Sequence, residues 1–229
     1  MKEINKEKYI VINKTKETHN VITLDLALID GSLPEYTPGQ FINIFFEEFS
    51  SPEGKAYSIS SSPKEKRFSI TIMAIGEFSN KLSSLNVGEI ICATLPCGYF
   101  FSESQDSHLI MISSGIGITP FRSMIINTDN NRSLSLHSSY RHTSDILFRE
   151  EMGNISNLNI KYYITREDVT SEYVNHRIHP SEIIRNIKEI KKTEFMVCGS
   201  IEFTRDMWRG LKDLGVSEDM IYTEAFFSH

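Results

Sequence analysis

The sequence contains few cysteines, no excess of basic residues and no long apolar run. Its 229 residues include only three cysteines, Cys92, Cys97 and Cys198. Three thiols are too few for a disulfide framework or for the four thiolates of an iron–sulfur cluster. Lysine and arginine total 24 against 30 aspartates and glutamates, so the net charge is −6. Such an acidic chain lacks the basic surface that neutralises nucleic-acid phosphates, which argues against a nucleic-acid partner.

Membrane insertion and export are also disfavoured by what is missing. No apolar stretch approaches the roughly 18 residues needed to span a bilayer. The first ten residues mix lysine and glutamate and carry no apolar signal core. With its few cysteines, the sequence is typical of a cytoplasmic protein without a membrane partner.

Aromatic and aliphatic residues are plentiful, and their pattern changes once along the chain. With 14 Phe, 9 Tyr and 40% apolar residues, the chain can build a core of one large or two small domains. The first hundred residues predict short strands separated by turns, with one amphipathic helix at 78–85, which favours an antiparallel barrel. The expected strands are 8–13, 21–28, 41–46, 56–60, 67–74 and 89–95.

From about Ser107 strands alternate with helices, as in a Rossmann-like α/β domain with a parallel sheet covered on both faces. We therefore predict two domains, residues 1–104 and 105–229. The second is also richer in arginine, since only Arg67 precedes residue 104 and nine arginines follow it. Either compositional drift or a need for phosphate-binding guanidinium groups accounts for this. The expected strands are 108–112, 133–140, 159–165, 195–198 and 220–223, and the expected helices are 120–126, 144–152, 181–190 and 202–214.

A glycine-rich segment lies where a predicted strand passes into a predicted helix. Glycines there let the backbone approach a pyrophosphate, and the helix N-terminus attracts anions. Proline suits the first helical turn because its missing N–H costs nothing there. A tight strand-to-helix turn without a ligand is the alternative. The segment comprises Gly115, Ile116, Gly117, Ile118, Thr119 and Pro120.

Two earlier segments carry groups suited to a flat polar ring beside a phosphate. The first segment places a cation, an aromatic ring and a hydroxyl on one strand, and it comprises Lys55, Ala56, Tyr57 and Ser58. An ordinary strand that enters a Ser-Pro turn would show the same sequence pattern. The second segment opens the short helix and offers an N-terminus and a hydroxyl to a second anion, or simply a plain helix cap. It comprises Gly76, Glu77, Phe78 and Ser79.

Taken in order, these segments resemble the motifs of the ferredoxin–NADP reductase-like flavoprotein family, and the resemblance covers essentially the whole chain. That family has an Arg-x-Tyr-Ser flavin segment, a Gly-x-x-Ser diphosphate helix, a Gly-x-Gly-x-x-Pro nicotinamide loop, a Cys-Gly segment and a Glu-x-aromatic ending. The sequence has Lys55–Ser58, residues 76–79, residues 115–120, Cys198-Gly199 and Glu224-Ala225-Phe226 at these places. Residues 38–41 (PGQF) and 95–100 (LPCGYF) resemble two further family segments.

The resemblance implies an N-terminal antiparallel FAD-binding β-barrel followed by a C-terminal NAD(P)-binding domain. It places Tyr57 on the isoalloxazine, Ser58 near flavin N5, and Lys55 with the 76–79 helix start at the FAD diphosphate. It assigns the 115–119 loop to the nicotinamide nucleotide, and Cys198 and Glu224 to the hydride-transfer site. Gly199 is expected among the cofactor-binding residues. Phe226 or Phe227 would cover the flavin until nicotinamide displaces it.

Two features bear on which cofactors are used. Lys55 stands where the family has arginine, and lysine cannot bind two phosphate oxygens in a planar fork. This substitution leaves FMN as an alternative to FAD. Arg141, Arg166 and Arg177 stand where NADPH-using relatives bind the 2′-phosphate, so we expect NADPH to be favoured, with NAD as the alternative.

The expected function is a flavoprotein oxidoreductase that passes hydride from NADPH to FAD. Because three cysteines cannot hold an iron–sulfur cluster, the one-electron acceptor must be a separate molecule, such as ferredoxin or flavodoxin. Two alternatives stay open: a flavin reductase that uses free flavin as substrate, and an electron-transfer subunit of a larger complex. No motif predicts a metal site.

Overall fold

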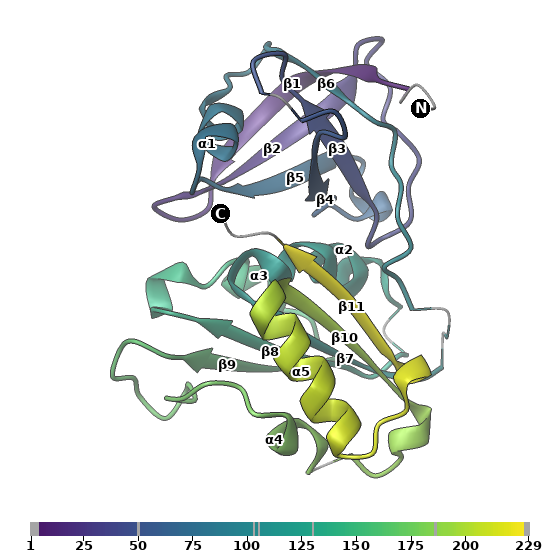
Figure 1. The fold of residues 1–229 in the computed structure, drawn as a ribbon, viewed down its shortest axis with the longest axis vertical. Coiled ribbons are helices and arrows are strands. Elements are labelled where there is room, and N and C mark those ends of the chain that lie inside the picture. Colours follow the sequence, from purple (N-terminus) through teal and green to yellow (C-terminus); the bar gives the residue numbers. More distant parts are fainter. Residues whose placement is uncertain are drawn as a thin grey trace. The chain divides into compact units, whose positions relative to one another are not determined.

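The computed structural model describes residues 5–49, 51–102, 104, 106–129, 131–185 and 187–226. It divides into two compact units (Figure 1). The first contains the chain up to Phe101 together with Thr119–Asn127, and the second contains Ser102–Ile118 and the chain from Thr128 onward. A helix from the second half of the sequence therefore groups with the N-terminal unit.

The first unit is an antiparallel barrel, as the strand spacing predicted. Its six strands follow the order β4-β3-β6-β1-β2-β5. A bridge between Ile59 and Ile70 joins the end of β4 to β5 and closes the sheet. The strands are β1 (Glu7–Lys16), β2 (Val21–Leu28), β3 (Phe41–Phe45), β4 (Lys55–Ser58), β5 (Phe68–Met73) and β6 (Ile90–Ala93).

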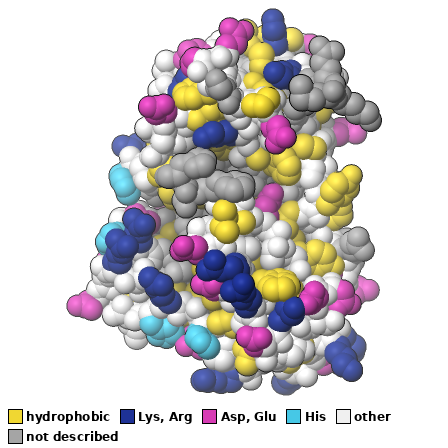
Figure 2. All heavy atoms as spheres, in the orientation of Figure 1, with side chains coloured by type: hydrophobic (Ala, Val, Ile, Leu, Met, Phe, Trp, Pro, Cys, Tyr) yellow, Lys and Arg dark blue, Asp and Glu magenta, His cyan; other side chains and the backbone are white. Residues whose placement is uncertain are grey.

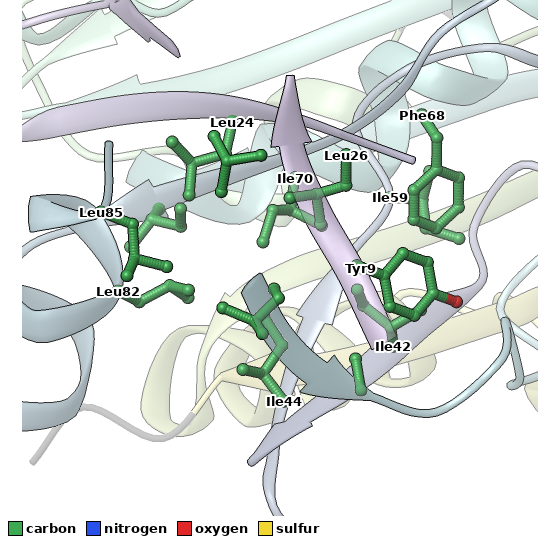
Figure 3. Close-up of a cluster of buried hydrophobic side chains, with 14 of the residues drawn as sticks. Tyr9, Leu24, Leu26, Ile42, Ile44, Ile59, Phe68, Ile70, Leu82 and Leu85 are labelled. Carbon is green, nitrogen blue, oxygen red and sulfur yellow. The ribbon is translucent and has the colours of Figure 1, made fainter. Parts of the chain in front are cut away.

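Aliphatic side chains from every strand but β4 fill the barrel, and Figure 3 shows how they converge. Helix α1 (Glu77–Ser84) adds Phe78 and Leu82 to this core. On β5, Phe68 and Ile70 point inward, and the alternating Ser69 and Thr71 are also buried. The Thr71 hydroxyl donates to the Ser60 hydroxyl, and the Ser69 hydroxyl donates to the Asp25 carboxylate. The Ser69 N–H donates to the Ser61 hydroxyl, so β5 is hydrogen-bonded to the 60–61 turn.

The second unit has a five-stranded parallel sheet, ordered β11-β10-β7-β8-β9. Helices α4 (Pro180–Ile184) and α5 (Ile201–Asp213) contribute to one hydrophobic cluster on this sheet. Ser200 caps α5 by accepting a hydrogen bond from the Phe203 N–H. The strands are β7 (His108–Ser114), β8 (Leu134–Tyr140), β9 (Leu158–Ile164), β10 (Thr193–Ser200) and β11 (Ile221–Phe226).

Two predicted helices are shorter than expected. The helix expected over 181–190 is only α4, and its cap is His179, whose Nδ1 accepts from the Ser181 N–H. Ile187 and Ile190 still pack on the same cluster, so the helical spacing of isoleucines reflects a shared core rather than a continuous helix. The helix expected over 144–152 is a 3₁₀ turn at Thr143–Asp145 followed by α3 (Arg149–Gly153).

The surface carries both charges. On the face drawn in Figure 2, basic and acidic side chains are interspersed rather than gathered into one basic patch, in keeping with the net charge of −6. Among the residues that the structure describes, none of the helices is long and apolar enough to cross a membrane.

Candidate functional site

Strand β4 and the start of α1 bring the two predicted flavin-binding segments together. The Tyr57 ring stacks on Phe78 of α1, with centroids 6.3 Å apart and planes 17° apart. The Lys55 ammonium lies 5.3 Å from the centroid of the same Phe78 ring. Burial raises the pKa of the Tyr57 hydroxyl, so this side chain stays neutral. A ring and a cation thus lie at the N-terminus of a helix.

Ser58, at the end of β4, has a buried hydroxyl oxygen without a hydrogen-bond partner among the described residues. Leaving a buried polar group unpaired costs free energy, so such atoms in native proteins call for an explanation. A ligand that hydrogen-bonds to this oxygen would remove the cost. The unpaired hydroxyl therefore fits a polar ring bound beside Tyr57.

The Ser79 hydroxyl, expected as a donor to a bound anion, is used within the turn that begins α1. It accepts hydrogen bonds from the N–H groups of Ile75 and Gly76 and donates to the Gly76 carbonyl, each at 3.0 Å. Gly76 has no side chain with which to cap the helix. Because the serine hydroxyl is already used, a phosphate at this helix start would have to bind the backbone N–H groups of the first turn.

The glycine-rich loop leads from β7 into helix α2 (Thr119–Asn127) through a 3₁₀ turn, Gly115–Ile118. Gly115 has φ +54°, a left-handed conformation that favours glycine. A Cβ atom on Gly117 would collide with the Cys198 carbonyl and lie 3.0 Å from the Gly199 Cα. The loop therefore packs directly on the predicted Cys198-Gly199 segment of β10, and only glycine permits this approach.

Cys198 and Glu224, both predicted near the hydride-transfer site, are parallel-strand partners on β10 and β11. Burial raises the pKa of the Glu224 carboxyl to about 7. Its Oε2 is buried and has no partner among the described residues. Burial, with Glu224 nearby, also raises the pKa of the Cys198 thiol well above its usual range. The thiol is therefore protonated and not an activated nucleophile.

Two of the three arginines predicted to select NADPH lie side by side. The Arg166 N–H donates to the Arg141 carbonyl at 3.0 Å, which joins the turns that follow β9 and β8. Both side chains are exposed. Arg177 is also exposed but belongs to a different segment, beyond the bridge that pairs Val174 with Tyr163.

The remaining predicted residues lie at the ends of elements. Ala56 is exposed on β4, and Ile118, Thr119 and Pro120 are buried where the loop enters α2. Phe226 ends β11 opposite Ser200 and is half-buried. Phe227 lies outside the described residues.

Sequence reasoning missed one buried pair, Arg122 of α2 and Glu65 of the 3₁₀ turn Pro63–Glu65. Arg122 is 3% exposed, and its guanidinium donates to both Glu65 carboxylate oxygens, at 2.9 and 3.0 Å. A signal for the turn was present, because Ser62 and Glu65 have the Ser-x-x-Glu spacing of a capping box, which forms here. Nothing local paired this glutamate with an arginine 57 residues away.

Comparison with known proteins identifies one domain and several similar proteins. The model of the oxidoreductase NAD-binding domain matches residues 111–208. The chain is 24% identical over 241 residues to a flavohemoprotein of Bordetella pertussis, a match that covers 94% of this chain and 59% of the relative. The chain thus spans about three fifths of the length of such relatives.

Two solved structures share the fold over the full chain. One is the Flavohem-like FAD/NAD binding domain of the nitric oxide dioxygenase of Vibrio cholerae, with a TM-score of 0.85, 22% identity and coverage of 96% of this chain and 98% of that one. The other is a ferredoxin–NADP⁺ reductase of Neisseria gonorrhoeae with bound FAD and NADP, with a TM-score of 0.77, 20% identity and coverage of 99% and 100%. These matches confirm the two-domain fold that the sequence indicated, and they agree with the resemblance drawn from the ordered motifs. The chain thus contains an oxidoreductase NAD-binding domain at residues 111–208 and shares its fold with ferredoxin–NADP⁺ reductases.

Proposed function

We propose that the chain binds FAD on its barrel, takes hydride from NADPH and passes the electrons to a separate acceptor such as ferredoxin or flavodoxin. The observation that carries this proposal is the buried, unpartnered Ser58 hydroxyl next to the Tyr57–Phe78 stack. The flavin supplies the hydride-accepting and electron-releasing chemistry, while the protein supplies binding, orientation and electrostatics.

The proposed role of each residue follows from the chemistry of its side chain or backbone. Tyr57 stacks on the flavin ring, and Ser58 gives its hydroxyl to a ring heteroatom. The Lys55 ammonium and the N-terminus of α1 neutralise the diphosphate. The Gly115–Ile118 loop and Thr119 hold the nicotinamide nucleotide, and Phe226 shields the site at the end of β11. At neutral pH, Glu224 is near the midpoint of its titration and can hold or release a proton beside Cys198.

Replacing Tyr57 with alanine should weaken FAD binding about five- to tenfold, because an aromatic stack is worth about 1 kcal/mol or slightly more. Flavin fluorescence quenched on titration with apoprotein measures the dissociation constant. Tyr57→Phe keeps the ring and should bind nearly as well as the wild type. Tyr99→Ala is the control, since Tyr99 is 91% exposed. Unchanged affinity in Tyr57→Ala would remove Tyr57 from the flavin site.

The absorption spectrum of the purified protein separates the proposal from its alternatives. A retained yellow flavin that NADPH bleaches, and that a one-electron acceptor reoxidises, supports the proposal. A protein that purifies colourless but reduces added flavin is a flavin reductase. A retained flavin that NADPH does not reduce indicates an electron-transfer subunit.

The arginines following β8 and β9 should confer a preference for NADPH. Arg141→Ala combined with Arg166→Ala should lower kcat/KM for NADPH at least tenfold and leave that for NADH nearly unchanged, because each charge-assisted bond to the 2′-phosphate is worth about 1.5–3 kcal/mol. Steady-state kinetics with both nucleotides is the measurement.

Two single variants complete the nucleotide experiment. Arg177→Ala shows whether that separate arginine participates. Arg149→Ala is the control, because Arg149 is an exposed arginine already paired with Glu172. Equal losses with NADPH and NADH in the double variant would mean that these side chains do not read the 2′-phosphate.

A further inference from the structure

Helix α2 is joined by hydrogen bonds to the turn that follows β4. The Arg122 Nη1 donates to the Ser60 carbonyl at 2.6 Å, and the guanidinium also spans both oxygens of Glu65. One position along α2, the Ser123 hydroxyl donates to the Ser61 carbonyl at 2.5 Å. Near the end of α2, Asn127 accepts from the Ser62 hydroxyl at 3.4 Å. Side chains at three positions of one helix are therefore hydrogen-bonded to three consecutive serines.

The residues of the 60–65 turn that α2 contacts are themselves held in place by other hydrogen bonds. The Ser62 N–H donates to Glu65 at 2.6 Å, and the Arg67 guanidinium donates to Glu65 at 2.7 Å. Ser60 is anchored to β5, because its N–H donates to the Ser69 carbonyl and its hydroxyl accepts from Thr71. The carboxylate that receives Arg122 is thus fixed by its own turn and cannot follow a displaced helix at little cost.

The two ends of this contact adjoin the two proposed cofactor-binding segments. Ser60 is two residues beyond Ser58, a separation of roughly 7 Å in extended chain. Arg122 is three residues beyond Thr119, less than one helical turn from the end of the glycine-rich loop. Thr119 and β4 belong to the same compact unit. Within this unit, the guanidinium therefore joins the helix that begins at Thr119 to the turn that follows β4.

The Arg122–Glu65 ion pair is expected to add little to the stability of the fold. Desolvating two charges offsets most of their attraction, and well-packed apolar side chains of similar volume are often as stabilising or more so. What a bidentate guanidinium–carboxylate pair does supply is fixed geometry, since its planar fork accepts only a narrow range of orientations. The contact is therefore suited to setting a position.

We propose that Arg122 is a positioning residue for hydride transfer. By binding the 60–65 turn, it holds the start of α2 in place and so fixes the position of Thr119 relative to Ser58. This inference rests on the proposed function. It goes further by assigning a role to a residue that touches neither cofactor. The rate of hydride transfer depends steeply on the relative position of the reacting groups, because a misplacement of about 1 Å lowers a rate on the order of a hundredfold.

The test compares two buried Arg–Glu pairs, one in each unit. Arg122→Lys keeps the charge and loses the fork. Arg132→Lys makes the same change in the pair formed by Arg132 and Glu194, which are joined at 2.8 Å and 7% and 4% exposed. Both variants should lower the midpoint of thermal unfolding. Stopped-flow reduction of the FAD-loaded protein by NADPH should slow about tenfold or more in Arg122→Lys only.

Binding measurements separate positioning from a lost binding site. Dissociation constants of Arg122→Lys for FAD and for NADP⁺ should each stay within about threefold of the wild type, because no contact to either ligand is removed. In the flavin-free protein, amide hydrogen exchange should rise in 60–65 and 119–123 for Arg122→Lys and not for Arg132→Lys. Equal slowing in both lysine variants, or an unchanged rate in Arg122→Lys, would overturn the proposal.

A paired apolar variant covers the case in which Arg122→Lys does not fold. Arg122→Met combined with Glu65→Met removes both charges, so it should recover stability but not the fixed orientation. Hydride transfer that stays slow in this stable protein supports positioning, and a wild-type rate rules it out. Failure of the proposed function looks different, because then the wild-type protein itself binds no flavin or is not reduced by NADPH.

Discussion

Replacing Gly117 with alanine should weaken binding of the nicotinamide nucleotide about 10- to 100-fold and leave flavin binding unchanged. The new Cβ would meet the carbonyl group of Cys198, whose carbon lies 2.7 Å away, and the Gly199 Cα at 3.0 Å. These are backbone atoms of a central strand, so the loop must move instead. Overpacking of this kind costs about 1–3 kcal/mol, and here it would displace the loop that we propose holds the nucleotide.

Titration with NADP⁺, followed by calorimetry or by the flavin difference spectrum, measures this loss. Gly153→Ala is the matched control, because a Cβ there meets no atom within 4 Å and Gly153 belongs to the same unit. Nucleotide affinity in Gly117→Ala equal to that in Gly153→Ala would show that the loop does not hold the nucleotide. A large loss of flavin affinity in Gly117→Ala would mean that the loop had been assigned to the wrong cofactor.

The glycine-rich loop could be predicted because its signal is local. Glycines, a preceding apolar strand and a following proline occupy one short window, and the structure forms the expected strand–loop–helix there. The barrel strands could be predicted for the same reason, since alternation on β5 is a property of six adjacent residues. The order of the motifs then indicated the family resemblance, which no single motif could.

The roles that depend on distant partners could not be predicted. Ser79 looked free to bind an anion, but its hydroxyl is satisfied within its own turn. A helix was expected over 181–190, yet Ile183, Ile187 and Ile190 reach one cluster from a five-residue helix and the segment after it. Arg122 and Glu65 pair across 57 residues, and only the packing of α2 against the 60–65 turn brings them together.

Glu224 should make the folded protein less stable as the pH rises from about 4.5 to about 8. Its pKa is raised from 4.5 to about 7 in the folded state because burial disfavours the charged carboxylate. The folded state therefore binds the proton more tightly than the unfolded state. The stabilisation is fully present below the unfolded pKa of 4.5 and is lost as the pH rises through 7. A shift of this size corresponds to about 3 kcal/mol.

Glu224→Gln removes the titration and should remove this part of the pH dependence. Urea unfolding at pH 5 and pH 8 gives the free energy of unfolding at each pH, and the difference should shrink by about 2.5 kcal/mol in the variant. Glu202→Gln, which changes an exposed glutamate in the first turn of α5, controls for the loss of one charge. If both variants keep the wild-type dependence, the Glu224 carboxyl is hydrated and ionised in the folded protein.

The same substitution connects this carboxyl to the proposed reaction. A neutral carboxyl offers an O–H donor, and the ionised form only accepts, so the group beside Cys198 changes its hydrogen-bonding character near pH 7. The pH profile of flavin reduction by NADPH should therefore have an inflection near 7 that is absent in Glu224→Gln. A stability effect without this inflection would mean that the carboxyl is buried for reasons unrelated to hydride transfer. An inflection that survives the substitution would belong to another group.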